Sequence, residues 1–475
     1  MSGEKILDAA MVAFKQTFIE FCREQPDAAG QQLSPELMSK LTKGIMAAAQ
    51  SAGQAGLAAY LRQHDTRESS VEVKGVRYRY KNTMAKTYLT LFGDVVADRA
   101  IYGSDTVGGY VAPLDLALGM GGDESATTDA REMILFAVSS STPEEVATLL
   151  AKASLCRPSR SAIQSIVVRD GTRMEEHRTA IAERVRQTQS IPAQARVLVA
   201  SMDGANVRLR EPGVKKGRKP QRPRSAENDG SASSSFRNAM VGSFSLYGRD
   251  QQGRAQRLCS SYQARMPQDN ALTFKEGFER AILDINGQIV AEDRIIDKVL
   301  LCDGHRAIWN YADHNDTLSE FQWCVDFYHT TEHLSRAAEA IFGAKSARGR
   351  RWYDRWREDL KTDPGAPVAI IRSMAGYAQR FRLSKTRREA LKVEQTFFKN
   401  NHRLMRYHEF IRKGYPIGSG PIEAAAKTIV KQRMCRSGMR WNRKTGQHIL
   451  TLRAYAKSQT WDAMWNAYTE LRLAA

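Results

Sequence analysis

The stretch DKVLLCDGHRAIW, residues 297–309, places four apolar residues, Val299 to Cys302, directly before an aspartate and a glycine. A short apolar run that ends at a turn signal is typical of a strand buried on both faces of a sheet. The carboxyl ends of such strands are where open α/β sheets place their chemistry. Asp303 is therefore either a turn residue, since Asp-Gly is a common turn pair, or a functional carboxylate at a sheet edge.

A second stretch, ARVLVASMDGANVRL at residues 195–209, repeats the pattern and predicts a strand that ends at Asp203-Gly204. Two carboxylates at the ends of neighbouring strands repel each other unless one holds a proton or a cation lies between them. Mg²⁺ is normally bound through one or two carboxylates and substrate phosphates. The pair of motifs therefore predicts a metal site for phosphate chemistry.

The chain is strongly basic, with 71 Lys+Arg against 52 Asp+Glu and a formal net charge of +19 over 475 residues. Such an excess is typical of a protein that binds nucleic acid. No apolar run approaches the roughly 18 residues of a membrane-spanning helix, and the first residues form an amphipathic segment with acids rather than a signal peptide. We therefore expect a soluble, cytoplasmic protein with a nucleic-acid partner.

The six cysteines are scattered without a C-x-x-C pair, which predicts neither a zinc ribbon nor a disulfide framework. His329 and His333 have the spacing of two zinc ligands on a helix, but the glutamate of H-E-x-x-H is not at its place. A zinc site is therefore not predicted.

The first part of the chain predicts three modules. Residues 1–65 have helical periodicity, with a helix start at Ser34-Pro35. Residues 66–122 alternate as strands do and include a hairpin signal at Gly93-Asp94. Residues 123–190 are helical, with a capped helix near Thr142 followed by a short turn and a second helix. That spacing suits either a DNA-binding helix-turn-helix or an ordinary αα-hairpin.

The remainder of the chain predicts an RNase H-like mixed sheet flanked by helices. Three antiparallel strands, a helix and two further strands occur in order over 191–343, and in that topology the first and fourth strands are adjacent. A loop at 211–236 is too rich in Pro, Gly, Ser and charge to bury a core. Its basic residues are predicted to grip DNA phosphates: Lys215, Lys216, Arg218, Lys219, Arg222 and Arg224. Residues 344–412 predict a helical insertion, and 413–475 complete the core with C-terminal helices.

A third acid, Glu423, follows Gly418-Ser419-Gly420-Pro421 and falls on the first turn of a predicted helix. It either compensates the helix dipole or completes a site in which two metal ions stabilise the attacking and leaving oxygens. Basic and aromatic residues after it are predicted to contact DNA: Lys427, Lys431, Arg433, Arg440 and Trp441. The alternative for Trp441 is a core anchor.

Four motifs then resemble a known family. SMDGANVRLRE (201–211), LLCDGHRAIW (300–309), VDFYHTTEHL (325–334) and YPIGSGPIEAAAKTIVKQRM with GMRW (415–441) are similar to those of bacterial insertion-sequence transposases of the ISKra type, related to Mutator-like DDE enzymes. The resemblance covers about 190–460. Many relatives carry a cysteine-containing metal knuckle after the small sheet, and this chain has none there.

The resemblance implies a catalytic and metal-binding triad of Asp203, Asp303 and Glu423, with Asp326 and His329 in a supporting role. It implies a transposase that uses two Mg²⁺ or Mn²⁺ ions to nick element ends and to join the freed 3′-hydroxyl to target DNA. Pairing two DNA ends implies a homodimer or higher oligomer. Three alternatives stay open: an RNase H-like nuclease without strand transfer, an inactive DNA-binding relative, and a phosphatase, although the D-x-D-G motif of the last is missing.

Overall fold

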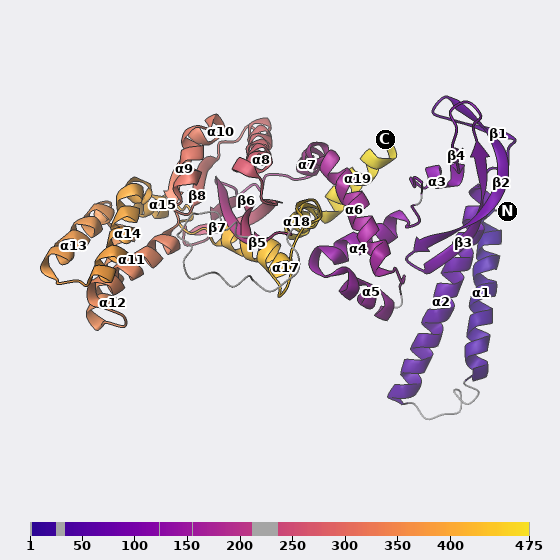
Figure 1. Cartoon of the computed structure of the whole chain (residues 1–475), viewed down its shortest axis with the longest axis horizontal. Coiled ribbons are helices and arrows are strands. Elements are labelled where there is room, and N and C mark those ends of the chain that lie inside the picture. Colours follow the sequence, from indigo (N-terminus) through magenta and orange to yellow (C-terminus); the bar gives the residue numbers. More distant parts are fainter. Residues whose placement is uncertain (1, 25–33, 123, 154, 211–235, 475) are drawn as a thin grey trace, which may run out of the picture. The chain divides into compact units, whose positions relative to one another are not determined.

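The computed structural model describes residues 2–24, 34–122, 124–153, 155–210 and 236–474 (Figure 1). The chain forms two compact units. Unit 1 comprises Met1–Met174 and Trp465–Ala475, and unit 2 comprises Glu175–Met464. The architecture is mixed α+β, with two sheets and many helices, which confirms the predicted fold class. No helix in the described ranges is long and apolar enough to cross a membrane.

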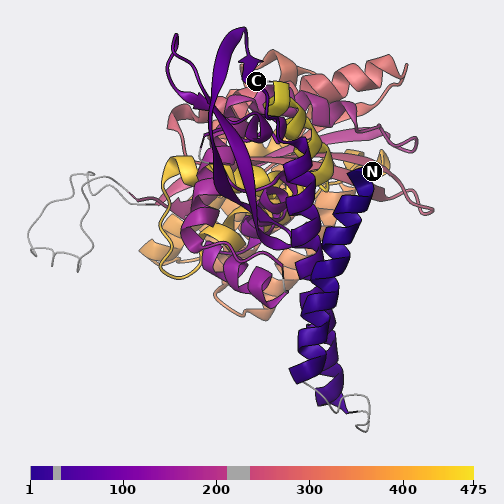
Figure 2. The same ribbon diagram turned by 90° about the vertical axis from the view of Figure 1, so that its right-hand side faces the viewer.

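Unit 1 begins with a hairpin of two helices, α1 (Ser2–Glu24) and α2 (Pro35–His64), which lie side by side in Figure 1 and Figure 2. The predicted start of α2 is confirmed, because the hydroxyl of Ser34 accepts a hydrogen bond from the backbone N–H of Leu37 at 3.1 Å. Such an N-cap, followed by proline in the first turn, satisfies a backbone donor that the helix itself leaves unpaired.

A four-stranded antiparallel sheet follows in unit 1, in the order β1 (Ser70–Val73), β2 (Val76–Thr90), β3 (Gly93–Gly103) and β4 (Tyr110–Val111). The turn between β1 and β2 consists of Lys74 and Gly75, both with positive φ (50° and 76°), as a two-residue hairpin turn that matches the strand twist requires. The predicted second hairpin is confirmed, and Gly93 begins its returning strand.

The remaining helices of unit 1 come from both ends of the chain: α3 (Pro113–Ala117), α4 (Thr128–Ser140), α5 (Pro143–Lys152), α6 (Arg160–Glu176) and α19 (Trp461–Ala474). A buried polar network holds α19 there. The carboxylate of Asp170, 1% exposed, accepts a hydrogen bond from the Tyr468 hydroxyl at 2.5 Å, and Glu124 accepts one from Arg472. The segment predicted to complete the catalytic core therefore ends in unit 1.

Thr142 begins α5 with a capping box, as predicted, since its hydroxyl accepts from the Glu145 N–H and the Glu145 carboxylate accepts from the Thr142 N–H. On α6 the residues Ile163, Ile166 and Val167 are buried. The helix-turn-helix interpretation of α5 and α6 stays a prediction.

Unit 2 is built on a five-stranded sheet in the order β7-β6-β5-β8-β9. The strands are β5 (Val197–Arg208), β6 (Phe236–Arg249), β7 (Ala255–Arg265), β8 (Asp297–Cys302) and β9 (Gln322–Val325). Strands β5, β6 and β7 are antiparallel, whereas β8 runs parallel to both β5 and β9. The predicted adjacency of the first and fourth strands is thus confirmed.

Both faces of the sheet in unit 2 are covered by helices. Along β8, Val299 and Leu301 face one apolar cluster, which includes Phe327 and Leu334 of the helix after β9, while Leu300 and Cys302 face another, which includes Phe278. All four β8 side chains are at most 1% exposed. Burial on both faces is the physical reason for the continuous apolar run in the sequence.

The helices of unit 2 are α7 (Arg178–Gln187), α8 (Leu272–Ala291), α9 (Arg306–Asp313), α10 (Asp316–Ser319), α11 (Phe327–Phe342), α12 (Ala347–Thr362), α13 (Ala366–Arg380), α14 (Lys385–Asn401), α15 (Tyr407–Arg412), α16 (Gly420–Ala425), α17 (Gln432–Met434) and α18 (Arg443–Lys457). Two 3₁₀ turns, η1 (Asp269–Ala271) and η2 (His402–Leu404), and a π-helical segment, η3 (Ala426–Lys431), complete it.

The prediction that the first strand ends at Asp203-Gly204 is wrong. Strand β5 continues to Arg208, because β6 pairs with it over its whole length. The parallel pairing of β5 with β8, however, stops at Ala200 and Leu300. Asp203 therefore lies inside β5, where β6 pairs with it on one side. On the other side, β8 no longer pairs with β5 at this position.

Phe278 of α8 is fully buried and its ring lies 4.9 Å from that of Phe244 on β6. The substitution Phe278→Ala should lower the free energy of unfolding by about 3 to 5 kcal/mol, because it leaves a cavity between helix and sheet. Val290→Ala on the same helix is a matched control, since Val290 is 76% exposed, and should change stability by less than about 0.5 kcal/mol. Urea unfolding followed by circular dichroism measures both, and equal effects would contradict the packing described.

Candidate active site

Two of the predicted acids, Asp203 and Asp303, lie near each other at one end of the β5–β8 pair. Asp203 accepts a hydrogen bond from the Gly204 N–H at 2.6 Å, and Asp303 accepts one from the His305 N–H at 3.0 Å. Burial raises the pKa of the Asp203 carboxyl, and the negative charge of Asp303 raises it further. Both effects disfavour the charged form of Asp203, so the site favours a compensating positive charge.

The third predicted acid, Glu423, lies on α16, and its carboxylate accepts a hydrogen bond from the Ser419 hydroxyl at 3.4 Å. Desolvation raises the pKa of Glu423, followed by the charges of Asp326, Glu332 and Asp203. The chain thus brings together acids from β5, from the loop after β8 and from α16.

A fourth acid, Asp326, joins these elements. It is 1% exposed and caps α11, where one carboxylate oxygen accepts from the His329 N–H at 2.5 Å. The other oxygen accepts from the backbone N–H of Ser419, just before α16. The backbone N–H of Asp326 donates to the carbonyl of Cys302 at 2.8 Å, the residue before Asp303. Asp326 therefore positions the segments that carry two of the acids.

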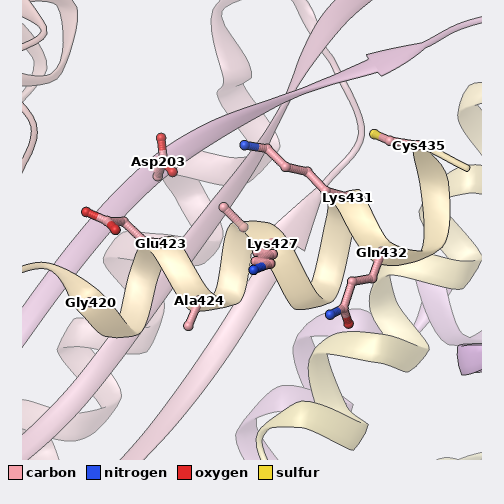
Figure 3. Close-up of a pocket in the computed structure, with 9 residues that line it drawn as sticks. Asp203, Gly420, Glu423, Ala424, Lys427, Lys431, Gln432 and Cys435 are labelled. Carbon is pink, nitrogen blue, oxygen red and sulfur yellow. The ribbon is translucent and has the colours of Figure 1, made fainter.

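An open hollow of about 810 Å³ lies between β5 and the helical run from α16 to α17. Its lining includes Asp203, Glu423, Lys427 and Lys431. Figure 3 shows the carboxylate of Glu423 beside Asp203 and the amine of Lys431 extending back toward Asp203 from the other side. The Lys431 charge lowers the pKa of Asp203, against the larger effect of burial. Ligand pockets commonly fall in a volume range of about 300 to 1,000 Å³.

The π-helical segment η3 decides where Lys431 lies. Lys431 follows Glu423 by eight residues. In a regular α-helix, residues eight positions apart point about 80° away from each other around the helix axis. A π turn takes up an additional residue, which brings Lys431 back to the face of Glu423. Carbonyls in this segment are bonded by Arg453 of α18, whose guanidinium donates to Ile429 at 2.7 Å and to Thr428. Burial lowers the pKa of Arg453 to about 10.

The imidazoles of His329 and His333 lie against each other and beside Glu394. Their Nε2 atoms are 3.3 Å apart, and the Nδ1 of His333 lies 2.5 Å from the carboxylate of Glu394 on α14. The His333 ring stacks on Phe397, with centroids 3.5 Å apart, and burial lowers its pKa. His329 lies close enough to Asp203 to lower the pKa of that acid slightly.

Two of the residues predicted to contact DNA serve the core instead. Arg433 is 2% exposed and its guanidinium lies 5.1 Å from the centroid of Trp441, so its prediction as a DNA-facing residue is wrong. Trp441 packs against the apolar cluster around Leu209, and its indole N–H donates to the Met434 carbonyl at 3.0 Å. The core-anchor alternative describes Trp441. The position of Trp441 was hidden in the sequence, because its backbone pairs with Arg208 and Leu209 at the end of β5, far away along the chain.

Of the other residues predicted to contact DNA, some are exposed in the structure and some lie outside the described residues. Lys427, Lys431 and Arg440 are exposed on unit 2. The basic residues predicted on the loop at 211–236 lie outside the described residues: Lys215, Lys216, Arg218, Lys219, Arg222 and Arg224. Their contact with DNA stays a prediction.

The donor set suits a hard divalent cation, because carboxylate oxygens are the ligands that Mg²⁺ prefers. Asp203, Asp303 and Glu423 are the residues that would hold it. Within the described part of the chain, no three His, Cys, Asp or Glu side chains stand close enough together to form a complete metal site. The acids share one region without forming a closed ligand shell.

Sequence reasoning missed how Asp326, Ser419 and Arg453 support the site. Asp326 before a helix has the pattern of an N-cap, which is a signal that could have been used. The bond to Ser419 spans 93 residues and the π turn depends on a helix 25 residues later, and no local pattern predicts either contact.

Comparison with known proteins found no matching family model and no matching curated protein. Among solved structures, the chain is similar to the Drosophila P element transposase strand transfer complex, at 10% sequence identity and a TM-score of 0.26. That similarity covers 71% of this chain and 81% of the other.

The raised pKa of Asp203 gives a pH dependence with a definite sign. Between its ordinary value of 3.8 and its folded value, the folded chain binds this proton and the unfolded chain does not. Stability from this group therefore falls as the pH rises through that window. In chelator, Asp203→Asn should melt at or above the wild-type temperature at pH 7.5, and the difference should disappear toward pH 4. A variant that is less stable at pH 7.5, and equally so at pH 4, would contradict the electrostatic account.

Proposed function

We propose that this chain is a metal-dependent DNA transposase that cuts and joins phosphodiester bonds through Asp203, Asp303 and Glu423. The observation that carries the proposal is that Asp203 and Glu423 line one open hollow with Lys427 and Lys431, while the charge of Asp303 acts on Asp203 from nearby. Burial and neighbouring acids raise the pKa of Asp203 and of Glu423, and such shifts are typical of functional sites. The mixed sheet with parallel β5 and β8 supplies the sheet edge where such acids meet.

The acids would hold two Mg²⁺ or Mn²⁺ ions, which would activate the attacking oxygen and neutralise charge on the phosphate. Each residue of the chain has its own task. Asp203 is fixed by β5 and its bond to Gly204, and Asp303 by its turn to α9. Asp326 positions Ser419, which in turn bonds Glu423. Lys431 would contact a non-bridging phosphate oxygen, since its amine faces the same hollow.

DNA is the substrate that best fits the charge of the chain. The net charge of +19 favours a polyanionic partner over a small phosphorylated metabolite. The hollow is open to solvent along the helical run from α16 to α17, as a site for a long substrate must be. The phosphatase alternative leaves this charge without a purpose.

A nuclease that lacks strand transfer is the second candidate, because hydrolysis and joining use the same acids. Incubation of the purified chain with labelled element ends and a supercoiled target plasmid distinguishes the two. A transposase yields joined products in which the 3′ end is covalently linked to plasmid DNA, and a nuclease yields cut ends alone.

Asp203→Asn, Asp303→Asn and Glu423→Gln should each lower nicking and joining by about a thousandfold or more, because loss of a metal ligand removes several kcal/mol of transition-state stabilisation. DNA affinity should stay within about threefold, since phosphate contacts carry it. Mg²⁺ should raise the melting temperature of the wild-type chain and raise it less in each variant. Near-normal cleavage by any one variant removes that residue from the triad.

Lys431→Ala and Lys427→Ala form a matched pair on one helical run. Each should reduce the slope of log K against log salt by about 0.9 if its amine contacts a phosphate. Lys431→Ala alone should also slow cleavage at saturating DNA, because only the Lys431 amine extends toward Asp203 in Figure 3. Lys298→Ala, whose amine pairs with Glu320 at 2.5 Å, is the control. Equal cleavage rates in the Lys431 and Lys427 variants would remove Lys431 from the reacting phosphate.

A further inference from the structure

The helical hairpin of unit 1 uses one stripe of each helix for its own contact. A Cβ added to Gly44 would lie 2.6 Å from the ring of Phe21, and one added to Gly56 would lie 3.6 Å from Ala10. Gly44, Ala48 and Gly56 of α2 are buried. Small residues on α2 therefore let α1 approach closely along a stripe that includes Ala10 and Phe21.

A second apolar stripe on α1 is left at the surface. Leu7, Met11, Phe14 and Phe18 follow one another at spacings of four, three and four residues, which is the heptad pattern of a helix that packs against another helix. Leu7 is 60% exposed and Met11 45% exposed. Phe14 and Phe18 are half-buried, and their rings stack with centroids 5.9 Å apart.

Helix α2 extends this stripe. Met38 and Ile45, 53% and 50% exposed, lie seven residues apart. On α2, Met38 and Ile45 lie about a quarter turn around the helix from the residues that contact α1. That places them on the same side of the hairpin as Leu7 and Met11. We call these six residues the hairpin face: Leu7, Met11, Phe14, Phe18, Met38 and Ile45.

The small sheet of unit 1 packs on a different side of α2. The side-chain amide of Gln54 donates to the carbonyl of Phe92 at 2.9 Å, and a Cβ added to Gly53 would meet the Phe92 ring at 2.4 Å. Two adjacent helices that expose a continuous apolar face gain stability when that face is covered. The spacing of the stripe and the charges of Asp8 and Lys15 indicate which surface covers the hairpin face.

The spacing of the stripe residues on α1 is symmetric along the helix: four, three and four residues in either direction. Leu7 and Phe18 are equidistant from a point between positions 12 and 13, and so are Met11 and Phe14. When two copies of α1 meet antiparallel about that point, Leu7 of each lies opposite Phe18 of the other, and Met11 lies opposite Phe14. A two-fold interface requires a patch that is complementary to itself in this way.

The charges beside the stripe are compatible with this pairing. Asp8 and Lys15 both follow a stripe residue directly and are seven residues apart, so they lie on one edge of it. In the antiparallel pair, Asp8 of one copy lies level with position 17 of the other, two residues or about 3 Å along the axis from Lys15. The side chains can span this offset, so each Asp8 can pair with Lys15 of the other copy. A parallel, in-register pair would align like charges instead.

We propose that the hairpin face is a homodimer interface at which a second copy of this chain packs with its α1 antiparallel, so that two hairpins form a four-helix bundle. The inference rests on unit 1 alone and is independent of the proposed function.

Sedimentation equilibrium of the full-length chain over a range of concentrations tests the interface. The wild-type chain should form a dimer, and Met11→Lys should weaken it at least about a hundredfold, because a charge in an apolar layer has no partner. Val12→Lys is the control, since Val12 is 53% exposed on another side of α1, and should leave the dimer intact. Circular dichroism checks that both variants keep their helices.

A charge exchange tests the antiparallel arrangement. Asp8→Lys and Lys15→Asp should each weaken the dimer by about threefold to tenfold at low salt, because each places like charges together. The double variant should restore wild-type affinity, and the two single variants should pair with each other when mixed. A monomeric wild-type chain, equal disruption by Val12→Lys and Met11→Lys, or a double variant as weak as the single ones would each overturn the proposal.

Discussion

The candidate active site depends on the buried carboxylate of Asp326. Its two oxygens accept backbone N–H groups from His329 and from Ser419, and its own N–H donates to the carbonyl of Cys302. A buried carboxylate is tolerated only when such donors surround it. The short aspartate side chain also fits the geometry of an N-cap. One residue therefore fixes the end of β8, the start of α11 and the segment before α16, which together determine where Asp303 and Glu423 lie.

The sheet itself places Asp203 where its negative charge is disfavoured. Because β6 pairs with β5 to its end while β8 stops pairing at Leu300, Asp203 is half-covered yet lies open toward the end of β8. Burial then raises its pKa, and a neighbouring acid adds to the effect. Such a conflict of charges is typical of functional sites. The lysine on the π-helical segment relieves it in part and supports an anionic substrate as the remaining partner.

The sequence predicted the elements of the sheet well, because burial on both faces of β8 leaves a continuous apolar run and the hairpin turns have strong local signals. The catalytic role of the three acids stays a prediction. The sequence was wrong about the end of β5, since that end depends on pairing with β6, and about Arg433, which is buried against Trp441. The π turn was not foreseen either, because its carbonyls are bonded by Arg453 from another helix. Long-range hydrogen bonds, not propensities, decide these details.

The acids and the hairpin face lie in different units, and this separation has a physical basis. The acids and Asp326 all belong to unit 2, where a sheet buried on both faces can hold them rigidly. The hairpin face belongs to unit 1, where two long helices provide a repeated stripe but no sheet edge for chemistry. The proposed transposition reaction would act on two DNA ends and would therefore need two copies of unit 2. A self-complementary helical surface in unit 1 can supply that pairing without altering the geometry of the acids, which is why the two features can be combined in one chain.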